Sequence, residues 1–167
     1  LGLLGLGRIG LEVARLGLAM GMDVVAWSRS LTREKASAHK IRYADSPSEV
    51  AAQSYVLSVH LAATEETRGL VDATLLESLA PGSLFINTSR FDVVDEEALL
   101  NRLDQQTLWA GLDVFSGEPA VKEGHWSHPL ALHPRVYGTH HIGASTAQAQ
   151  EAVGEEICRI VETFRDS

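Results

Sequence analysis

The sequence predicts a doubly wound α/β fold, in which helices cover both faces of one parallel sheet. Apolar, strand-like segments alternate with segments of helical periodicity through most of the 167 residues. The run Val24–Trp27 is apolar without interruption, which is typical of a parallel strand buried on both faces. Right-handed connections between such strands give a parallel doubly wound sheet. The hydrophobic content of 45% is enough for one compact domain with its own core.

A glycine-rich turn joins the first strand to the first helix. The apolar residues 1–4 lead directly into Gly5, Gly7 and Gly10, which are spaced as Gly-x-Gly-x-x-Gly. Gly5 permits a tight turn, Gly7 lets the backbone approach a pyrophosphate, and Gly10 lets the helix pack on the sheet. The free N–H groups of the helix N-terminus favour a bound phosphate. We therefore expect a Rossmann-type dinucleotide site; the alternative is a close-packed turn without a ligand.

In the first half of the chain, apolar patterns and caps define the other elements. The helix after the turn has a wide apolar face and ends before Gly21. Ser46 and Pro47 suit the N-cap and the first position of a short helix. The expected helices are residues 8–20, 32–40 and 46–52, and the expected strands are residues 23–27, 41–43 and 55–60.

The second half continues this alternation. Acidic residues begin one of its helices, where they suit the helix dipole. Ser145 and Gln148 form a capping box for a long last helix, whose apolar stripe runs from Ala149 to Phe164. The expected helices are one or two within residues 64–79, then 95–103 and 145–165; the expected strands are 83–88, 108–114 and 136–139. A long irregular loop, with an exposed Trp126, is expected before the last strand.

Composition limits the classes of function. The net charge of −8 and the isoelectric point of about 5.3 argue against a nucleic-acid or anionic membrane surface. No apolar run reaches the roughly 18 residues of a membrane-spanning helix. A single cysteine, Cys158, cannot form an internal disulfide and fits a reducing compartment, so we expect a cytoplasmic protein. We expect no metal, because His125, His128 and His133 lack metal-ligand spacing and are interpreted as loop residues.

The residues after the second expected strand bear on cofactor choice. NAD-binding versions of this fold carry an acid there, which holds the adenosine ribose. Here the residues are Ser28, Arg29 and Ser30, with Arg33 close enough in sequence to help. A hydroxyl group and a guanidinium can instead bind a 2′-phosphate. We therefore expect NAD(P) as cofactor with NADP(H) favoured; the alternative is a solvated loop arginine.

Chemically useful side chains follow three successive strands in the second half of the chain. Arg90, Glu118 and His141 come after these strands, whose carboxyl ends share one edge of a parallel sheet. A guanidinium can bind a carboxylate and polarise the adjacent carbonyl, and an imidazolium can protonate its oxygen as hydride arrives at carbon. A carboxylate on the other ring nitrogen would orient the imidazole. Singly, each residue also has an ordinary structural reading as a paired arginine, a surface acid or a core histidine.

Four blocks of the sequence resemble one family over nearly the whole chain. They are Gly5–Gly10, Asn87–Arg90 with Val94–Glu96, Gly111–Phe115 with Glu118–Pro119, and His141–Thr146. In order and spacing they resemble the D-isomer-specific 2-hydroxyacid dehydrogenases, most of all the 3-phosphoglycerate dehydrogenase branch. The resemblance implies hydride transfer between a nicotinamide cofactor and a 2-oxo acid or D-2-hydroxy acid, such as 3-phosphoglycerate, glyoxylate or hydroxypyruvate.

The resemblance also implies roles for individual residues. Arg90, Glu118 and His141 would form the catalytic set. The remaining expected cofactor contacts are Gly5, Gly7, Arg8, Ile9, Gly10, Ser28, Arg29, Ser30, His60, Leu61, Thr67, Thr88, Ser89, Asp113, Gly143 and Ala144, together with Arg90 and His141. His60 alone is interpreted as structural rather than catalytic.

The sequence departs from the family at several positions. Ser28 replaces the usual acid, Phe91-Asp92 replaces a glycine-led pair beside Arg90, and His140 replaces a proline. Family members have a second, substrate-binding domain built from both chain ends, which is absent here, so we interpret residues 1–167 as a dinucleotide-binding domain excised from a longer protein. We expect it to bind cofactor with little or no turnover, because a closed cleft between domains excludes water.

The family also bears on assembly and on competing functions. Its members are generally dimers or tetramers, so the full-length protein is expected to be a homodimer. One alternative is a non-enzymatic dinucleotide sensor, because the family includes a corepressor branch. Another is a related Rossmann enzyme such as an amino-acid dehydrogenase, against which the Arg–Glu–His order argues.

Overall fold

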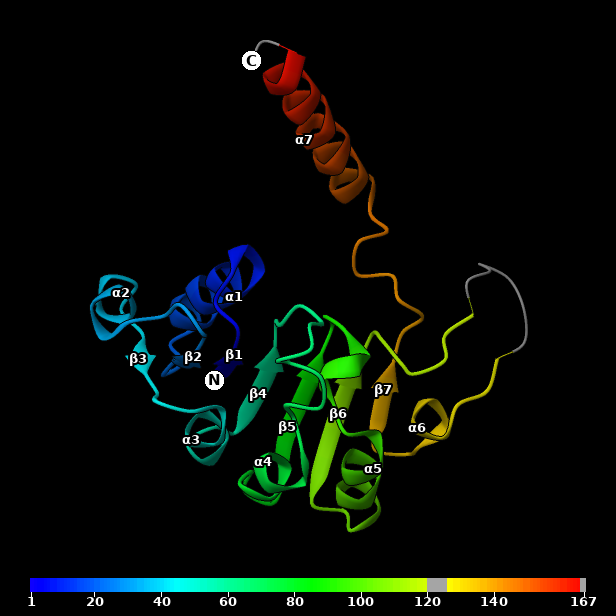
Figure 1. Ribbon diagram of the computed structural model, residues 1–167. Helices are drawn as coiled ribbons and strands as arrows, with labels where there is room; N and C mark the ends of the chain where they lie inside the picture. The colour runs from blue at the N-terminus through cyan, green and yellow to red at the C-terminus, as the bar shows by residue number, and fades with distance from the viewer. Residues whose placement is uncertain (120–125, 166–167) are drawn as a thin grey trace.

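Seven parallel strands form one sheet in the computed structural model, which describes residues 1–119 and 126–165 (Figure 1). The strands are β1 (Gly2–Leu4), β2 (Val25–Trp27), β3 (Arg42–Tyr43), β4 (Val56–Val59), β5 (Ser83–Asn87), β6 (Leu108–Leu112) and β7 (Val136–Gly138). Their order is β3-β2-β1-β4-β5-β6-β7. Chain order reverses between β1 and β4, so the carboxyl ends of these strands mark the point where ligands bind in such folds. The expected doubly wound fold is confirmed.

The helices lie on the connections between strands. They are α1 (Arg8–Ala19), α2 (Arg33–Ala38), α3 (Pro47–Ala52), α4 (Ala73–Glu77), α5 (Glu96–Asp104), α6 (Pro129–Leu132) and α7 (Ala147–Arg165), with a 3₁₀ helix, η1 (Phe91–Val93). Alternate strand residues divide the core into two layers. Leu3 packs in the smaller layer with Ala14 of α1, whereas Leu4 packs in the larger layer with Val50 of α3 and Leu99 of α5.

Part of the sheet face opposite the larger layer lacks a cover among the described residues. Phe85 and Ala110 face the larger layer, so their strand neighbours Leu84 and Trp109 face the other way. These two residues are paired in register between β5 and β6, and their exposed fractions are 36% and 46%. The Arg135 guanidinium lies 4.6 Å from the centre of the Trp109 ring.

Side-chain caps fix the helix starts that the sequence predicted. Ser46 accepts a hydrogen bond from the Glu49 N–H at 3.1 Å, and Asp95 accepts one from the Ala98 N–H at 3.0 Å. Each such cap stabilises its helix by about 1 kcal/mol. The capping box at Ser145 is wrong, because Ser145 closes a turn onto the Ile142 carbonyl. The cap of α7 is Thr146, whose hydroxyl accepts the Ala149 N–H at 3.1 Å.

The long loop expected before the last strand contains a helix. His128 is the N-cap of α6, and its side chain accepts the Leu130 N–H; His133 follows the last helical residue. His128 is buried, so reading it as a simple loop residue was incomplete. His125 and the side chain of Phe164 lie outside the description.

Helix α7 extends away from the sheet (Figure 1). Val153, Ile157, Ile160 and Val161 on this helix are 55–61% exposed. Among the described residues, no helix is both long enough and apolar enough to cross a membrane.

Candidate active site

The glycine turn at the carboxyl end of β1 is shaped by two different constraints. Gly5 has a φ of +96°, and a Cβ atom there would lie 2.4 Å from the His60 carbonyl oxygen. A Cβ on Gly10 would lie 2.3 Å from the Gly5 carbonyl oxygen, whereas one on Gly7 would meet nothing within 4 Å. Packing within the domain therefore excludes side chains at Gly5 and Gly10. At Gly7 only open surface is preserved, which fits the close approach of a pyrophosphate.

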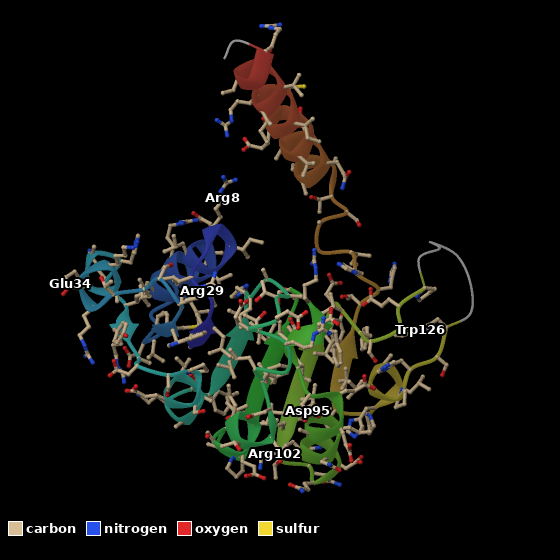
Figure 2. All side chains as sticks on the ribbon, viewed as in Figure 1. Arg8, Arg29, Glu34, Asp95, Arg102 and Trp126 are labelled. Atoms are coloured by element: carbon tan, nitrogen blue, oxygen red, sulfur yellow. The ribbon has the colours of Figure 1, made fainter. Side chains whose placement is uncertain are left out.

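The first turn of α1 faces this open surface. No side chain caps the helix at Gly7, and its first turn contains no acidic residue. Its N–H groups and dipole are thus available to an anion. Arg8 and Ile9 are exposed beside the turn, and Figure 2 shows Arg8 pointing away from the sheet. The local structure fits a dinucleotide pyrophosphate.

A small hollow lies beside the residues that follow β2. It has a volume of about 160 Å³ and is lined in part by Ser28, Ser30 and Lys35. The Lys35 ammonium donates a hydrogen bond to the Ser30 carbonyl at 3.3 Å. Arg29 is exposed near the turn (Figure 2), with its guanidinium 4.0 Å from the Glu66 carboxylate. Sequence reasoning missed Lys35, because only the fold of α2 returns it to the end of β2.

Arg33 does not join this group. Its guanidinium pairs with Asp45 at 2.7 Å and lies over the Tyr43 ring at 4.7 Å. These two partners hold Arg33 beside β3 in this structure, and its help at a cofactor phosphate stays a prediction.

His60 and Thr67 shape the loop that follows β4. The His60 ring is partly buried, and burial lowers its pKa. Its Nε2 atom lies 3.0 Å from the Ser58 hydroxyl. The Thr67 hydroxyl donates to the Ala62 carbonyl at 2.6 Å, which closes a turn beyond the partly buried Leu61. Both polar side chains thus hold the loop in this structure.

Asn87 at the end of β5 organises the loop that carries Arg90. Its side chain is fully buried. The amide donates to the Arg90 carbonyl at 2.9 Å and accepts from the Ser89 N–H at 3.0 Å. Thr88 and the Arg90 side chain are exposed, and the guanidinium reaches the Ser89 carbonyl at 2.7 Å. The sequence motif contains Asn87, but its role in holding Arg90 became clear only from the fold.

Glu118 and His141 form a pair across 23 sequence positions. The His141 Nδ1 atom lies 2.8 Å from the Glu118 Oε2 atom, and the other Glu118 oxygen accepts the Phe115 N–H. The imidazole is about half exposed, so its second nitrogen can meet a ligand. His141 has a φ of +57°, a left-handed conformation that is costly for a residue with a side chain. The preceding His140 is exposed.

Asp113 holds the segment that carries His141. Its two oxygens accept the N–H groups of Ile142 and Gly143, each at 2.9 Å, and the Thr139 hydroxyl also donates to it. Burial acts to raise the pKa of Asp113, but these hydrogen bonds and the nearby His141 outweigh it and lower the pKa. The carboxylate therefore fixes the backbone around His141. Ala144 follows this segment and is exposed.

One cavity brings the expected catalytic residues together. It has a volume of about 440 Å³ and is lined by Arg90, Glu118 and His141, with Arg68, Phe91, Asp92, Val94, Glu96 and residues 114–117. The arginine and the imidazole thus lie on the same edge of the sheet. A guanidinium, a carboxylate–imidazole pair and space for a small molecule can together bind an acid and transfer a proton.

A second polar cluster includes two residues that line this cavity, Glu96 and Ser116. The buried His128 Nε2 atom lies 3.1 Å from Glu96 and 3.0 Å from the Ser116 hydroxyl, which donates to the same carboxylate. Trp126 stacks on the His128 ring at 5.1 Å, and its ring meets Phe115 edge-on at 5.6 Å. Trp126 thus packs against its own domain and is still 38% exposed, which agrees with the expectation of an exposed loop tryptophan.

No group of three or more His, Cys, Asp or Glu side chains within residues 1–119 and 126–165 is arranged to hold a metal.

Comparison with known proteins identifies the family to which this glycine turn and this Arg–Glu–His cavity belong. A family model described as the NAD-binding domain of D-isomer-specific 2-hydroxyacid dehydrogenases matches residues 1–143. The chain belongs to this family. Membership confirms the resemblance seen in the sequence and makes this chain an NAD-binding domain of D-2-hydroxyacid dehydrogenase type.

Several members of the family are similar over nearly all of this chain. D-3-phosphoglycerate dehydrogenase of Bacillus subtilis is 36% identical over 98% of this chain and 30% of its own length. Hydroxypyruvate reductase of Thermotoga maritima is 36% identical over 94% of this chain and 50% of its own. The crystal structure of D-lactate dehydrogenase from Aquifex aeolicus, complexed with NAD and lactic acid, superposes with a TM-score of 0.84. Its sequence is 31% identical, and the match covers 99% of this chain and 53% of that one.

This chain spans only about a third to a half of the length of these D-2-hydroxyacid dehydrogenase relatives. The names of the relatives describe enzymes, so they give no support to the alternative of a non-enzymatic sensor.

Proposed function

We propose that the protein containing this domain transfers hydride between NAD(P)H and a 2-oxo acid, with the D-2-hydroxy acid as the reduced product. The observation that supports it most is the Glu118–His141 pair at 2.8 Å, in the same cavity as Arg90 and on the edge that carries the dinucleotide turn. The nicotinamide, when bound, supplies or accepts the hydride.

The side chains of this domain would do the rest. Arg90 binds the substrate carboxylate and polarises the adjacent carbonyl. His141 donates a proton from its exposed nitrogen to the carbonyl oxygen and accepts it in the reverse direction. Glu118, on the other nitrogen, keeps the imidazole oriented. Asp113 and Asn87 hold the two loops in place, so the site is formed before substrate arrives.

The proposal is tested with the full-length protein and a panel of 2-oxo acids, including glyoxylate, pyruvate and hydroxypyruvate. Oxidation of NADH or NADPH with at least one of them is expected, and where the product is chiral, as with pyruvate and hydroxypyruvate, it should be the D-isomer. Absence of cofactor oxidation with every substrate, in a protein that binds the cofactor, would refute it.

We further propose that NADP(H) is preferred over NAD(H). Ser28 stands where an acid would repel a 2′-phosphate, and Arg29 and Lys35 supply cations beside the hollow. Glu66 competes for Arg29 across 4.0 Å, so the preference is expected to be moderate. Dissociation constants measured by titration should favour NADPH, and Arg29→Gln and Lys35→Gln should each weaken NADPH binding more than NADH binding. Tighter binding of NADH by the unaltered protein would overturn this preference.

We also propose a substrate-binding domain outside this chain, a homodimeric full-length protein and a cytoplasmic location. The exposed Leu84, Trp109 and α7 side chains support further contacts, and the single Cys158 fits a reducing compartment. Light scattering should give twice the chain mass, and cell fractionation should recover the protein with cytoplasmic markers. A monomer or a recovery with another compartment would contradict the corresponding proposal.

A further inference from the structure

We propose that Asp92 and Arg68 select the substrate by the charge of the group beyond its 2-oxo acid moiety. The pair disfavours a phosphate-bearing 2-oxo acid and favours a substrate whose distal group is neutral and polar, such as a hydroxymethyl group. This inference rests on the proposed function and adds a substrate preference to it.

The pair lies in the wall of the cavity that contains the catalytic set. Asp92 is in η1, two residues after Arg90, and Arg68 lies in the turn after β4; both line the cavity. The Arg68 guanidinium is 3.4 Å from the Asp92 carboxylate. The Gly69 N–H donates to the Asp92 carbonyl at 2.9 Å, so the two backbones are joined as well as the two side chains.

The other charged groups of the wall already have partners. Glu118 faces His141 at 2.8 Å, and Glu96 faces His128 at 3.1 Å. The proposed role of Arg90 uses its charge for the substrate carboxylate. Arg68 is then the other guanidinium among the described lining residues. Its charge is balanced by Asp92 and by Glu65, whose carboxylate lies 3.9 Å away.

A second anionic group would therefore find no unmatched cation among the described residues that line the cavity. A phosphate would meet the Asp92 carboxylate as a like charge, or would have to separate Arg68 from it. A neutral hydroxyl meets neither cost, because it can accept from Arg68 or donate to Asp92. Both side chains are more than half exposed, so the repulsion is partly screened and should weaken as salt rises.

The experiment compares kcat/KM of the full-length enzyme for hydroxypyruvate and for 3-phosphohydroxypyruvate. The unaltered enzyme is expected to prefer hydroxypyruvate. Asp92→Asn should raise the ratio of phosphorylated to unphosphorylated efficiency about tenfold at low salt, and less at high salt. Asp92→Ser is a second uncharged variant in case the asparagine variant does not fold.

A double variant and a matched control make the test specific. In Asp92→Asn with Arg68→Met, the gain should disappear, because the freed guanidinium is what would bind the phosphate. Asp23→Asn removes the same charge from an exposed ion pair, with Arg42 at 2.8 Å, at the opposite ends of the strands. It should leave the ratio unchanged.

The outcomes separate this inference from the function on which it rests. Reduction of neither substrate, nor of any other 2-oxo acid, would overturn the proposed function itself. Activity with a preference for the phosphorylated substrate, or an unchanged ratio in both Asp92 variants, would overturn only the selectivity. An equal gain in the double variant would overturn the pairing of Asp92 with Arg68.

Discussion

The Nδ1 atom of His141 lies 2.8 Å from the Oε2 atom of Glu118. This contact directs the other ring nitrogen toward the cavity that Arg90 also lines. One carboxylate thus orients the imidazole, while its second oxygen holds the Phe115 backbone in the same turn. Glu118 therefore couples the shape of its own loop to the direction of the His141 ring.

Replacing His141 by Ala in the full-length protein should lower kcat by roughly 10²–10⁴-fold, because the proton donor is lost. Glu118→Gln should give a smaller loss, since the ring remains but the acceptor for its Nδ1 proton is replaced. Steady-state kinetics with a 2-oxo acid measure both, and thermal unfolding of each variant serves as the control for correct folding. Unchanged kcat in His141→Ala would remove this residue from the mechanism.

Gly7→Ala should weaken cofactor binding, whereas Gly10→Ala should lower thermal stability. At Gly7 a Cβ meets no described atom within 4 Å, so stability should change by less than about 1 kcal/mol while cofactor binding weakens about tenfold. At Gly10 the Cβ would lie 2.3 Å from the Gly5 carbonyl, so the melting temperature should fall. Thermal unfolding and cofactor titration of the two variants, side by side, check this contrast. Equal destabilisation by both would contradict it.

Asp113→Ala should loosen the segment that carries His141. The N–H groups of Ile142 and Gly143 would lose their acceptor, and a lost hydrogen bond of this kind costs about 1–3 kcal/mol. Amide hydrogen exchange at these two residues should accelerate, and kcat should fall in the full-length enzyme. Exchange at Ser89, whose N–H is held by Asn87, should not change and is the internal control.

Stability should fall below about pH 6.5 because of His60. Burial lowers its pKa in the folded protein, whereas the unfolded chain takes up the proton near the usual value of about 6.5. Acid therefore favours the unfolded state, and above that pH both states are neutral and the effect vanishes. Urea unfolding between pH 8 and pH 5.5 should show a smaller loss in His60→Gln than in the unaltered domain. Parallel curves would show that His60 does not contribute.

Residues 1–167 alone should bind the dinucleotide but show little or no turnover. The glycine turn and the hollow beside β2 are formed within this chain, whereas the described residues enclose the catalytic cavity only in part. Calorimetric titration measures binding, and cofactor oxidation with 2-oxo acids measures turnover. Sustained turnover by this chain would contradict the expectation that a second domain closes the site.

Features determined by neighbouring residues in the chain could be predicted from the sequence. The glycine spacing, the uninterrupted apolar strands and the caps at Ser46 and Asp95 each depend on a few adjacent positions. Parallel topology then places these strand ends on one edge, so it could be predicted that Arg90 and His141 lie on the same edge of the sheet.

Features that depend on distant partners could not be predicted in this way. Arg33 is drawn to Asp45 and Tyr43, and His128 is buried against Glu96 and Ser116, by packing that no short pattern encodes. The shift of the α7 cap from Ser145 to Thr146 has the same origin, because Asp113 fixes the preceding turn. The roles of Lys35 and Asn87 likewise emerged only once the chain was folded.

The left-handed backbone at His141 affects which variants a laboratory selection for thermal stability would favour. A library screened for heat resistance alone is expected to enrich glycine or asparagine at this position, since both relax the conformation. The selected variants would be more stable but would lack the proposed proton donor. A selection for stability should therefore also measure the proposed hydride transfer, because stability alone would select against the imidazole.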